Sequence, residues 1–344
     1  MNFTEIDINQ KKISIGLPVF NGEEFIRKKL ESILSQTFTN FELIISDNAS
    51  TDSTSEICKE FEKKDKRIRY YKQNKTIAPI LNYDFILQKA ECEYFLWTAV
   101  DDVLLPKFVE KNLEIMVKNK NVVSSVSRMK LYGPMTEYME SKISNKSFFS
   151  RAYKKYYQKN GYQDTFPASG NYENRVKEYM KNIRHNQVLY GIYRTEQIKK
   201  SFVNVSFIAS DAATTLDLLK YGELYVTDEI LMEVYDSGMS RSGMIEGLKK
   251  MHQKNMGSIF PFFPFTVWCI NNLGRRFFLK NLSFFMKINY EGGASLFIDI
   301  LRHLGLNPES KFLGFSYKWK YYSEIVLQDF NNRWDENSQV LVNF

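Results

Sequence analysis

Two adjacent acids, Asp101 and Asp102, follow an apolar run at residues 94–98. Neighbouring carboxylates after a buried strand repel each other unless a cation or a strong set of donors compensates their charge. A divalent metal would do so, and oxygen ligands completed by diphosphate oxygens favour Mg²⁺ or Mn²⁺. The alternative is that Asp102 is a solvated loop acid near a helix that begins at Pro106.

A second polar group could recognise a nucleotide. Residues 18–24 are Pro-Val-Phe-Asn-Gly-Glu-Glu, and Asp47 begins the segment Asp-Asn-Ala-Ser-Thr-Asp after another apolar run. The ring of Phe20 can stack on a base, and Asp47 can accept a hydrogen bond from a base N–H group. These segments contain no GxGxxG sequence, which disfavours a dinucleotide cofactor. The alternative is that the Asn-Gly pair and the asparagine after Asp47 only supply turn and cap chemistry.

A third acid, Asp211, stands at the start of a predicted helix over residues 212–220. As an N-cap it would only satisfy N–H groups at the helix start. It could equally be a general base that the helix start presents to a crevice. The sequence leaves both interpretations open.

The elements that must position these residues alternate between short β-rich runs and helical stretches. This alternation predicts an α/β fold with a mostly parallel sheet flanked by helices. Ligands bind beyond the carboxyl ends of such strands, so we expect the polar residues that follow them to converge. The predicted strands are 13–19, 41–46, 68–72, 94–98, 188–193 and 224–227, and the helices among the first four are 24–35, 53–63 and 78–89.

Composition changes twice along the chain. Residues 133–182 are rich in Tyr, Lys, Ser and Asn with several turn signals, which predicts a long variable loop region. From residue 243 onward the pattern is helical and rich in aromatic residues. We therefore predict a domain at residues 1–242 and a helical C-terminal appendage at residues 243–344.

The 344 residues, with 44% hydrophobic and 25% charged side chains, exclude the disordered and fibrous classes. The net charge is +7, and residues 241–344 hold 13 Lys and Arg against 8 Asp and Glu. Since no long basic run occurs, a nucleic-acid partner is not expected. Residues 275–287 interleave cations with Phe and Leu, which fits a helix at an anionic membrane surface. The alternative is an ordinary core-facing helix with its cations on the solvent side.

Three scattered cysteines, Cys58, Cys92 and Cys269, are too few for a disulfide framework and fit a reducing compartment. The first residues show no signal-peptide pattern. The apolar run 259–270 contains two prolines and is too short to span a bilayer. We therefore expect a cytoplasmic protein, which residues 275–287 could bring to the cytoplasmic face of the membrane.

Five segments, in order, resemble family 2 glycosyltransferases of the GT-A fold. They are ISIGLPVFNGEEFI, FELIISDNASTDST, FLWTAVDDVLLP, YGIYRT and SDAATTLDLLKYG, within about residues 12–241. The resemblance implies a Rossmann-like sheet and a hexosyltransferase-type enzyme. It implies that a sugar moves from a nucleotide diphosphate donor to an acceptor hydroxyl, with inversion. The acceptor would be a glycan or a lipid-linked precursor in surface polysaccharide or glycoconjugate biosynthesis.

The resemblance also implies roles for single residues. Pro18, Phe20 and Asp47 match positions that hold the donor base and ribose, with Asn21 and Glu23 in the same motif. Asn82 matches a position close to the donor. Asp101 matches the second acid of the metal-binding Asp-x-Asp element, with Asp102 directly after it, and Asp211 matches the catalytic base.

Two departures qualify these roles. Ala99 stands where the first acid of the Asp-x-Asp element is expected, and Ser237 stands where many relatives carry a metal-binding His. Metal binding would then rest on Asp101 with help from Asp102.

One alternative is a non-catalytic relative that binds nucleotide sugars or glycans. A sugar nucleotidyltransferase is less favoured, because residues 18–24 offer only one glycine and no cation. His185 is a further candidate for approaching the acceptor, though a lone His is more often structural.

Overall fold

The computed structural model describes residues 12–134, 136–137, 165–183, 186–236, 244–251 and 255–305. Contacts between residues divide the chain into two units, Met1–Gly238 and Met239–Phe344. Of the predicted variable region 133–182, the structure describes 133–134, 136–137 and 165–182. His185 and Ser237 lie outside the described residues.

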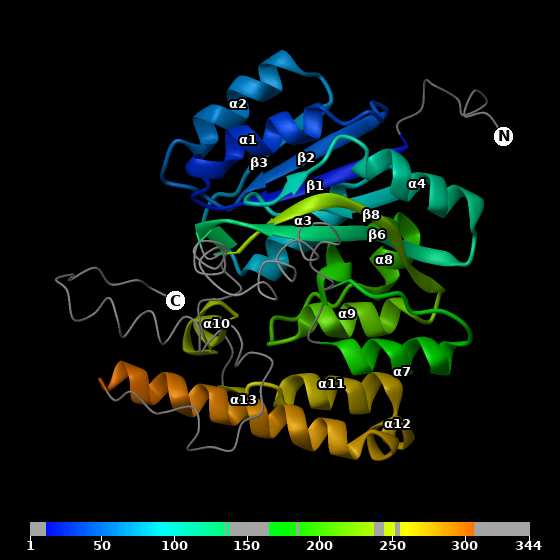
Figure 1. Ribbon diagram of the computed structural model, residues 1–344. Helices are drawn as coiled ribbons and strands as arrows, with labels where there is room; N and C mark the ends of the chain where they lie inside the picture. The colour runs from blue at the N-terminus through cyan, green and yellow to red at the C-terminus, as the bar shows by residue number, and fades with distance from the viewer. Residues whose placement is uncertain are drawn as a thin grey trace, which may run out of the picture. The chain divides into compact units, whose positions relative to one another are not determined.

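A mixed sheet with the strand order β3-β2-β1-β4-β7-β6-β8-β5 forms the centre of the first unit (Figure 1). The pairs β1–β2, β2–β3, β1–β4 and β6–β8 are parallel, whereas β7 and β5 pair antiparallel with their neighbours. The mostly parallel α/β sheet predicted from the sequence is therefore confirmed. The strands are β1 Ile13–Val19, β2 Phe41–Asp47, β3 Ile68–Lys72, β4 Tyr94–Trp97, β5 Val103–Leu104, β6 Val122–Tyr132, β7 Ile192–Arg194 and β8 Glu223–Tyr235.

Helices cover both faces of the parallel strands. Successive strands β1, β2 and β3 step in one direction and β4 returns to the other side of β1. Right-handed crossovers then put α1 and α2 on one face and α3 on the other, as Figure 1 shows. The helices of this unit are α1 Glu23–Leu34, α2 Thr54–Lys64, α3 Pro79–Lys89, α4 Phe108–Lys118, α7 Tyr172–Asn182, α8 Thr195–Ser201 and α9 Ser210–Leu218.

Every residue of β1 and β2 is buried, as expected for parallel strands covered on both faces. Gly16 of β1 lets α3 approach closely, because a Cβ atom there would clash with Cγ2 of Ile86. The sheet therefore has a packed centre, and the polar residues are left for the loops at its carboxyl edge.

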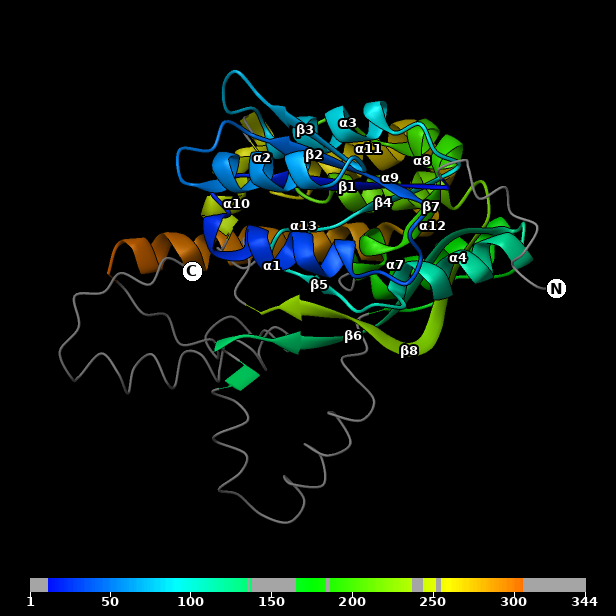
Figure 2. The same cartoon turned by 90° about the horizontal axis from the view of Figure 1, so that it is seen from above.

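Two strand predictions were incomplete. Residues 188–193 divide into a 3₁₀ helix at Asn186–Tyr190 and the short strand β7. The long strand β6, which runs beside β8 in Figure 2, was not predicted. Its sequence looks polar because it contains Ser124, Ser125 and Ser127, although all three side chains are buried. Alternation of hydrophobic and polar residues could not reveal a strand whose inner positions hold serine.

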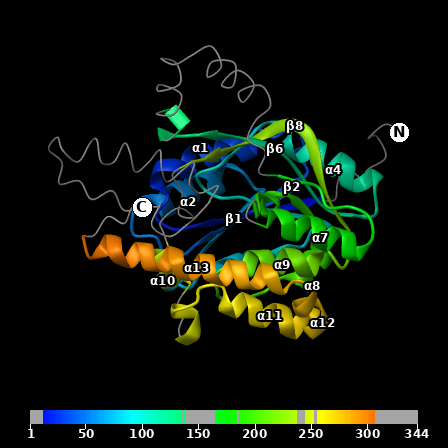
Figure 3. The ribbon, with the colours of Figure 1, turned by 60° about the horizontal axis from the view of Figure 1, so that its bottom comes forward.

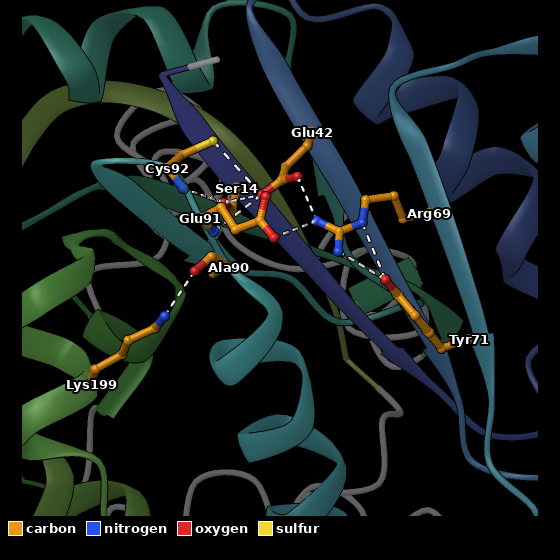
Figure 4. A network of polar contacts seen from close by, with 8 residues as sticks. All are labelled: Ser14, Glu42, Arg69, Tyr71, Ala90, Glu91, Cys92 and Lys199. Atoms are coloured by element: carbon orange, nitrogen blue, oxygen red, sulfur yellow. Dashed lines mark hydrogen bonds and ion pairs between the residues drawn. The ribbon is translucent and has the colours of Figure 1, made fainter. Parts of the chain in front are cut away.

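A polar network around the buried Glu42 and Ser14 lies at the amino ends of the strands (Figure 4). Glu42 accepts hydrogen bonds from Ser14 Oγ at 2.6 Å and from Arg69 at 3.0 Å, and Arg69 also contacts Glu91 at 3.7 Å. The Cys92 N–H donates to Ser14 Oγ at 3.2 Å. These groups satisfy one another, so this end of the sheet is structural and the opposite edge is left for chemistry.

The second unit is helical. Its elements are α10 Met244–Lys250, a 3₁₀ turn at Asn255–Ser258, α11 Phe263–Leu273, α12 Arg275–Lys280 and α13 Leu282–His303. Figure 3 shows α11 and α13 side by side, with α12 at one end. Phe285 is buried against Phe265 and Phe278, with ring centroids 6.4 and 5.3 Å away. The predicted single helix over 275–287 is wrong, because α12 ends at Lys280 and α13 begins at Leu282. No described helix is both long and apolar enough to span a membrane.

Candidate active site

Hydrogen bonds join the loops that follow β1 and β2. The Asn21 N–H donates to Ser50 Oγ at 2.9 Å, and Asn21 Oδ1 accepts from the Thr51 N–H at 2.9 Å. Glu23 Oε2 likewise accepts from the Ser53 N–H at 3.0 Å. Asn21 and Glu23, which were predicted to contact the donor, therefore fix the position of the second loop. Through these protein contacts they shape the two loops at this edge of the sheet.

Asp47 ends β2 and is fully buried. Its Oδ1 accepts from the Ser50 N–H at 2.7 Å, while its Oδ2 accepts from Ser55 Oγ at 2.6 Å and Tyr70 OH at 2.7 Å. Burial alone raises the pKa of Asp47, but these hydrogen bonds outweigh it and lower the pKa below its usual value. With both oxygens engaged by protein donors, Asp47 holds the loop after β2 in place, and its predicted contact with a base stays a prediction.

The other predicted donor residues differ in accessibility. Asn82 is buried, and its side chain exchanges two hydrogen bonds with Ser46, at 2.6 and 3.0 Å. Pro18 lies inside β1 beyond the point where β4 ends, so its missing N–H interrupts no ladder. Phe20, directly after β1, is 43% exposed. Of these residues, Phe20 presents an open ring face on which a base could stack.

The acid pair follows β4, and its two carboxylates have different surroundings. Asp102 is buried; its Oδ1 accepts from the Tyr235 N–H at 3.1 Å, and its Oδ2 has no hydrogen-bond partner. Asp101 is partly exposed, and its backbone carbonyl accepts a hydrogen bond from the Tyr132 hydroxyl. Burial raises the pKa of both carboxyls, that of Asp102 to about 7.

A buried lysine compensates this acid pair. The Nζ of Lys29, in α1, donates to Thr98 Oγ1 and to the Asp102 carbonyl oxygen, the latter at 2.8 Å. Burial lowers the pKa of Lys29 to about 8, opposed by the negative charges of Asp102 and Asp101. This residue was not predicted from the sequence. It lies on the buried face of α1 with Ile26, Leu30 and Ile33. A charged side chain among apolar residues on one helix face is unusual, and this pattern could have indicated a buried lysine with a partner.

The oxygens of this turn fit a hard divalent cation in part. Asp101 offers a partly exposed carboxylate, and the unpartnered Asp102 Oδ2 is a second oxygen without a hydrogen bond. Among the described residues, no group of three or more His, Cys, Asp or Glu side chains could hold a metal alone. Mg²⁺ and Mn²⁺ commonly take one or two carboxylates plus substrate phosphates, so the donor set suits a cation shared with a diphosphate.

Asp211 is the second residue of α9, whose N-cap is Ala209. The interpretation of Asp211 as the N-cap is therefore wrong. Ala209 has a φ of 71°, in the left-handed region that costs an L-residue about 1–2 kcal/mol. Among the described non-glycine residues, the others with positive φ are Asn21 and Ala49, after β1 and β2. Two of these three residues, Asn21 and Ala49, therefore lie in the loops at the carboxyl edge, and backbone of this kind is common at functional sites.

Two tyrosines connect Asp211 with the acid pair. Burial is the largest cause that raises the pKa of Tyr83, in α3, and of Tyr190, before β7. The negative charges of Asp101, Asp102 and Asp211 raise both values further. All three acids therefore act on the same two phenols. Neither tyrosine was predicted from the sequence, although Tyr190 is the first residue of the YGIYRT segment.

Comparisons with known proteins assign this chain to a family. The profile of Glycosyl transferase family 2 matches residues 14–214. An uncharacterized glycosyltransferase of Rickettsia typhi is 34% identical over 113 residues, which are 32% of this chain and 34% of that protein. Glycosyltransferase GlyA of Streptococcus pneumoniae is 32% identical over 152 residues, 41% of this chain and 22% of that protein. The chain thus spans about a third or less of the length of these relatives.

Two solved structures share the fold. TarS 1–349 of Staphylococcus aureus in complex with UDP-GlcNAc aligns with a TM-score of 0.55 and 16% identity, covering 90% of this chain and 77% of that one. The mannosyltransferase PcManGT of Pyrobaculum calidifontis, in complex with GDP-Man and Mn²⁺, aligns with a TM-score of 0.50 and 11% identity. That alignment covers 96% of this chain and 90% of the other. At these identities the likeness establishes a GT-A type fold.

Proposed function

The chain belongs to glycosyl transferase family 2, and we propose that it transfers a sugar from a nucleotide diphosphate donor to an acceptor hydroxyl, with inversion at the anomeric carbon. The observation that carries this proposal is the acid turn after β4, where the buried Asp102 leaves its Oδ2 without a hydrogen-bond partner beside the partly exposed Asp101. A base and a diphosphate-binding turn must lie on one site for such a transfer.

The donor would bind at the carboxyl edge of β1 and β2. Phe20 offers its exposed ring to the base, and the hydrogen-bonded loops after the two strands form the wall beside it. The fold neighbours with UDP-GlcNAc and GDP-Man support a nucleotide sugar as the donor class. Asn21, Glu23, Asp47 and Asn82 act by holding these loops, because their side chains engage the protein.

In the transfer, the Asp211 carboxylate takes the proton of the acceptor hydroxyl as the acceptor oxygen attacks the anomeric carbon. The bond from that carbon to the diphosphate oxygen breaks, and a nucleoside diphosphate leaves. A single in-line displacement of this kind inverts the configuration. Asp101, with Asp102 behind it, would hold Mg²⁺ or Mn²⁺, which when bound neutralises charge on the departing diphosphate.

The acceptor we propose is a glycan or a lipid-linked precursor in surface polysaccharide or glycoconjugate biosynthesis. We also propose that the enzyme works in the cytoplasm, where activated sugars are used. The three cysteines of the chain are free and buried, which agrees with a reducing compartment.

Asp211→Asn tests the proposal. Turnover of UDP- and GDP-sugars with a panel of acceptors should fall by at least about a hundred-fold, because a general base is lost. Thermal stabilisation by the nucleoside diphosphate should be unchanged. Asp217→Asn, on the same helix, is the matched control and should keep its turnover.

Two results would count against the proposal. If no nucleotide stabilises the wild type with or without Mn²⁺, the donor site is wrong. If nucleotides bind but no acceptor is modified, the chain is a non-catalytic binding relative.

A further inference from the structure

Helix α13 carries apolar side chains on two different faces. Its inner face packs within the second unit, where Phe285, Ile288 and Leu296 are buried. A second set of apolar side chains points outward and is exposed, with Met286 at 66% and Leu304 at 69%. This outer stripe consists of Leu282, Met286, Tyr290, Phe297, Ile300 and Leu304.

The outer stripe is continuous along the helix. At 3.6 residues per turn, its six positions fall within an arc of about 80°. Gly293 lies on the same line, and a Cβ atom there would meet no atom within 4 Å. Since α13 has 22 residues, the stripe extends over about 33 Å. A long, narrow and continuous apolar face at a protein surface marks an interaction site.

The charges on α12 and near the start of α13 indicate what kind of partner the stripe would bind. Four exposed cations lie on α12 or near the start of α13, namely Arg275, Arg276, Lys280 and Lys287. Within the described residues 255–305 there are two acids, and neither is exposed. Glu291 is buried, and Asp299 accepts hydrogen bonds from the backbone N–H groups of Met244 and Ile245. The described part of this surface thus combines exposed apolar side chains with exposed positive charge.

We propose that the outer stripe of α13, together with the cations of α12 and Lys287, binds the surface of an anionic lipid membrane. Lys287 lies about 60° around the helix from the edge of the stripe, where its long side chain can reach lipid phosphates while the stripe enters the acyl boundary. A second copy of the chain fits less well, because neither acid within the described residues 255–305 is exposed to pair with these cations across a contact. This surface goes beyond the proposed sugar transfer and does not depend on it.

Vesicle sedimentation of the full chain tests the proposal. The wild type should sediment with vesicles of phosphatidylglycerol and phosphatidylcholine, and much less with phosphatidylcholine alone. Met286→Glu and Phe297→Glu should each weaken the partition at least about ten-fold, because each puts a charge in the acyl boundary. Val205→Glu is the matched control, since it makes the same kind of change at an exposed apolar residue of the first unit.

The charge component has its own variant. Lys287→Gln should weaken binding to the anionic vesicles about five-fold, and added salt should do the same to the wild type. Thermal melts and nucleotide binding of all variants show whether they fold and whether the donor site is intact, so failure of the membrane surface and failure of the proposed function are distinguishable.

Three results would overturn the proposal. The wild type could show no preference for anionic vesicles. It could be a dimer that Met286→Glu converts to a monomer, which would assign the stripe to a second copy. It could ignore vesicles while Met286→Glu and Phe297→Glu lower the melting temperature, which would mean that the chain itself covers the stripe.

Discussion

The side-chain nitrogen of Lys29 lies 2.8 Å from the backbone carbonyl oxygen of Asp102, and both side chains are buried. The same nitrogen donates to Thr98 at the end of β4. The Lys29 ammonium therefore lies beside the acidic turn and offsets part of the negative charge of Asp101 and Asp102 without any metal. This arrangement explains how two adjacent carboxylates are tolerated in a turn where Ala99 contributes no further ligand.

Lys29→Met should destabilise the protein. The substitution keeps much of the side-chain length but removes the charge and the donor, and leaving the buried Asp102 carbonyl without its partner costs about 1–3 kcal/mol. Urea unfolding with and without Mn²⁺ measures this loss, and Mn²⁺ should restore more stability to the variant than to the wild type. Lys63→Met, at an exposed position of α2, is the control. Equal stability of the two variants would mean that Lys29 compensates nothing.

Phe20→Ala should weaken nucleotide binding by about ten-fold or more, because the stacking of a base on an aromatic ring contributes about 1–3 kcal/mol. The fold should be unaffected, since this ring is exposed. Titration of the melting temperature with UDP and GDP measures the change. Leu81→Ala removes an equally exposed side chain, 44% against 43%, and should bind nucleotides as the wild type does. Unchanged binding in Phe20→Ala would place the base elsewhere.

Asp47→Asn should change the response of stability to acid. Because the pKa of Asp47 is lower in the folded protein, its carboxylate adds stability above the unfolded value of about 3.9, and this is lost as pH falls through the folded value. The free energy of unfolding, measured from about pH 6 to about pH 3, should therefore fall less steeply for the variant than for the wild type.

The same variant separates two roles of Asp47. If the carboxylate only holds the loop through Ser50, Ser55 and Tyr70, any loss of nucleotide affinity should be similar for UDP and GDP. A loss confined to one base would show that Asp47 contacts the base directly.

Ala49→Gly should stabilise the protein. Ala49 has a φ of 62°, where glycine avoids the strain of a Cβ atom, so the gain should be about 1 kcal/mol in urea unfolding. Ala90→Gly is the control, because Ala90 has a φ of −70° and should lose stability. A destabilised Ala49→Gly variant would show that the loop after β2 carries no such strain.

The sequence by itself determined the sheet edge at which the chemistry must lie. β1, β2 and β4 were predictable because each is a short apolar run with a polar end, and β3 because its aromatic residues favour a strand; the connections between them are local. The spacing of Asp101 from Pro106 and the start of the helix at Asp211 could likewise be found in neighbouring residues. Convergence of the strand ends follows from parallel pairing and needs no further information.

Only the tertiary structure decided what each polar side chain does there. Asp47 and Asn82 turn inward to protein donors, whereas Phe20 stays open, and hydrogen-bond partners tens of residues away set that difference. Lys29 meets the carbonyl of a residue 73 positions later. Such contacts depend on how helices and strands pack, because a buried polar group must find its partner wherever the fold brings one. The spacing of residues along the sequence does not show which partner a buried polar group will meet.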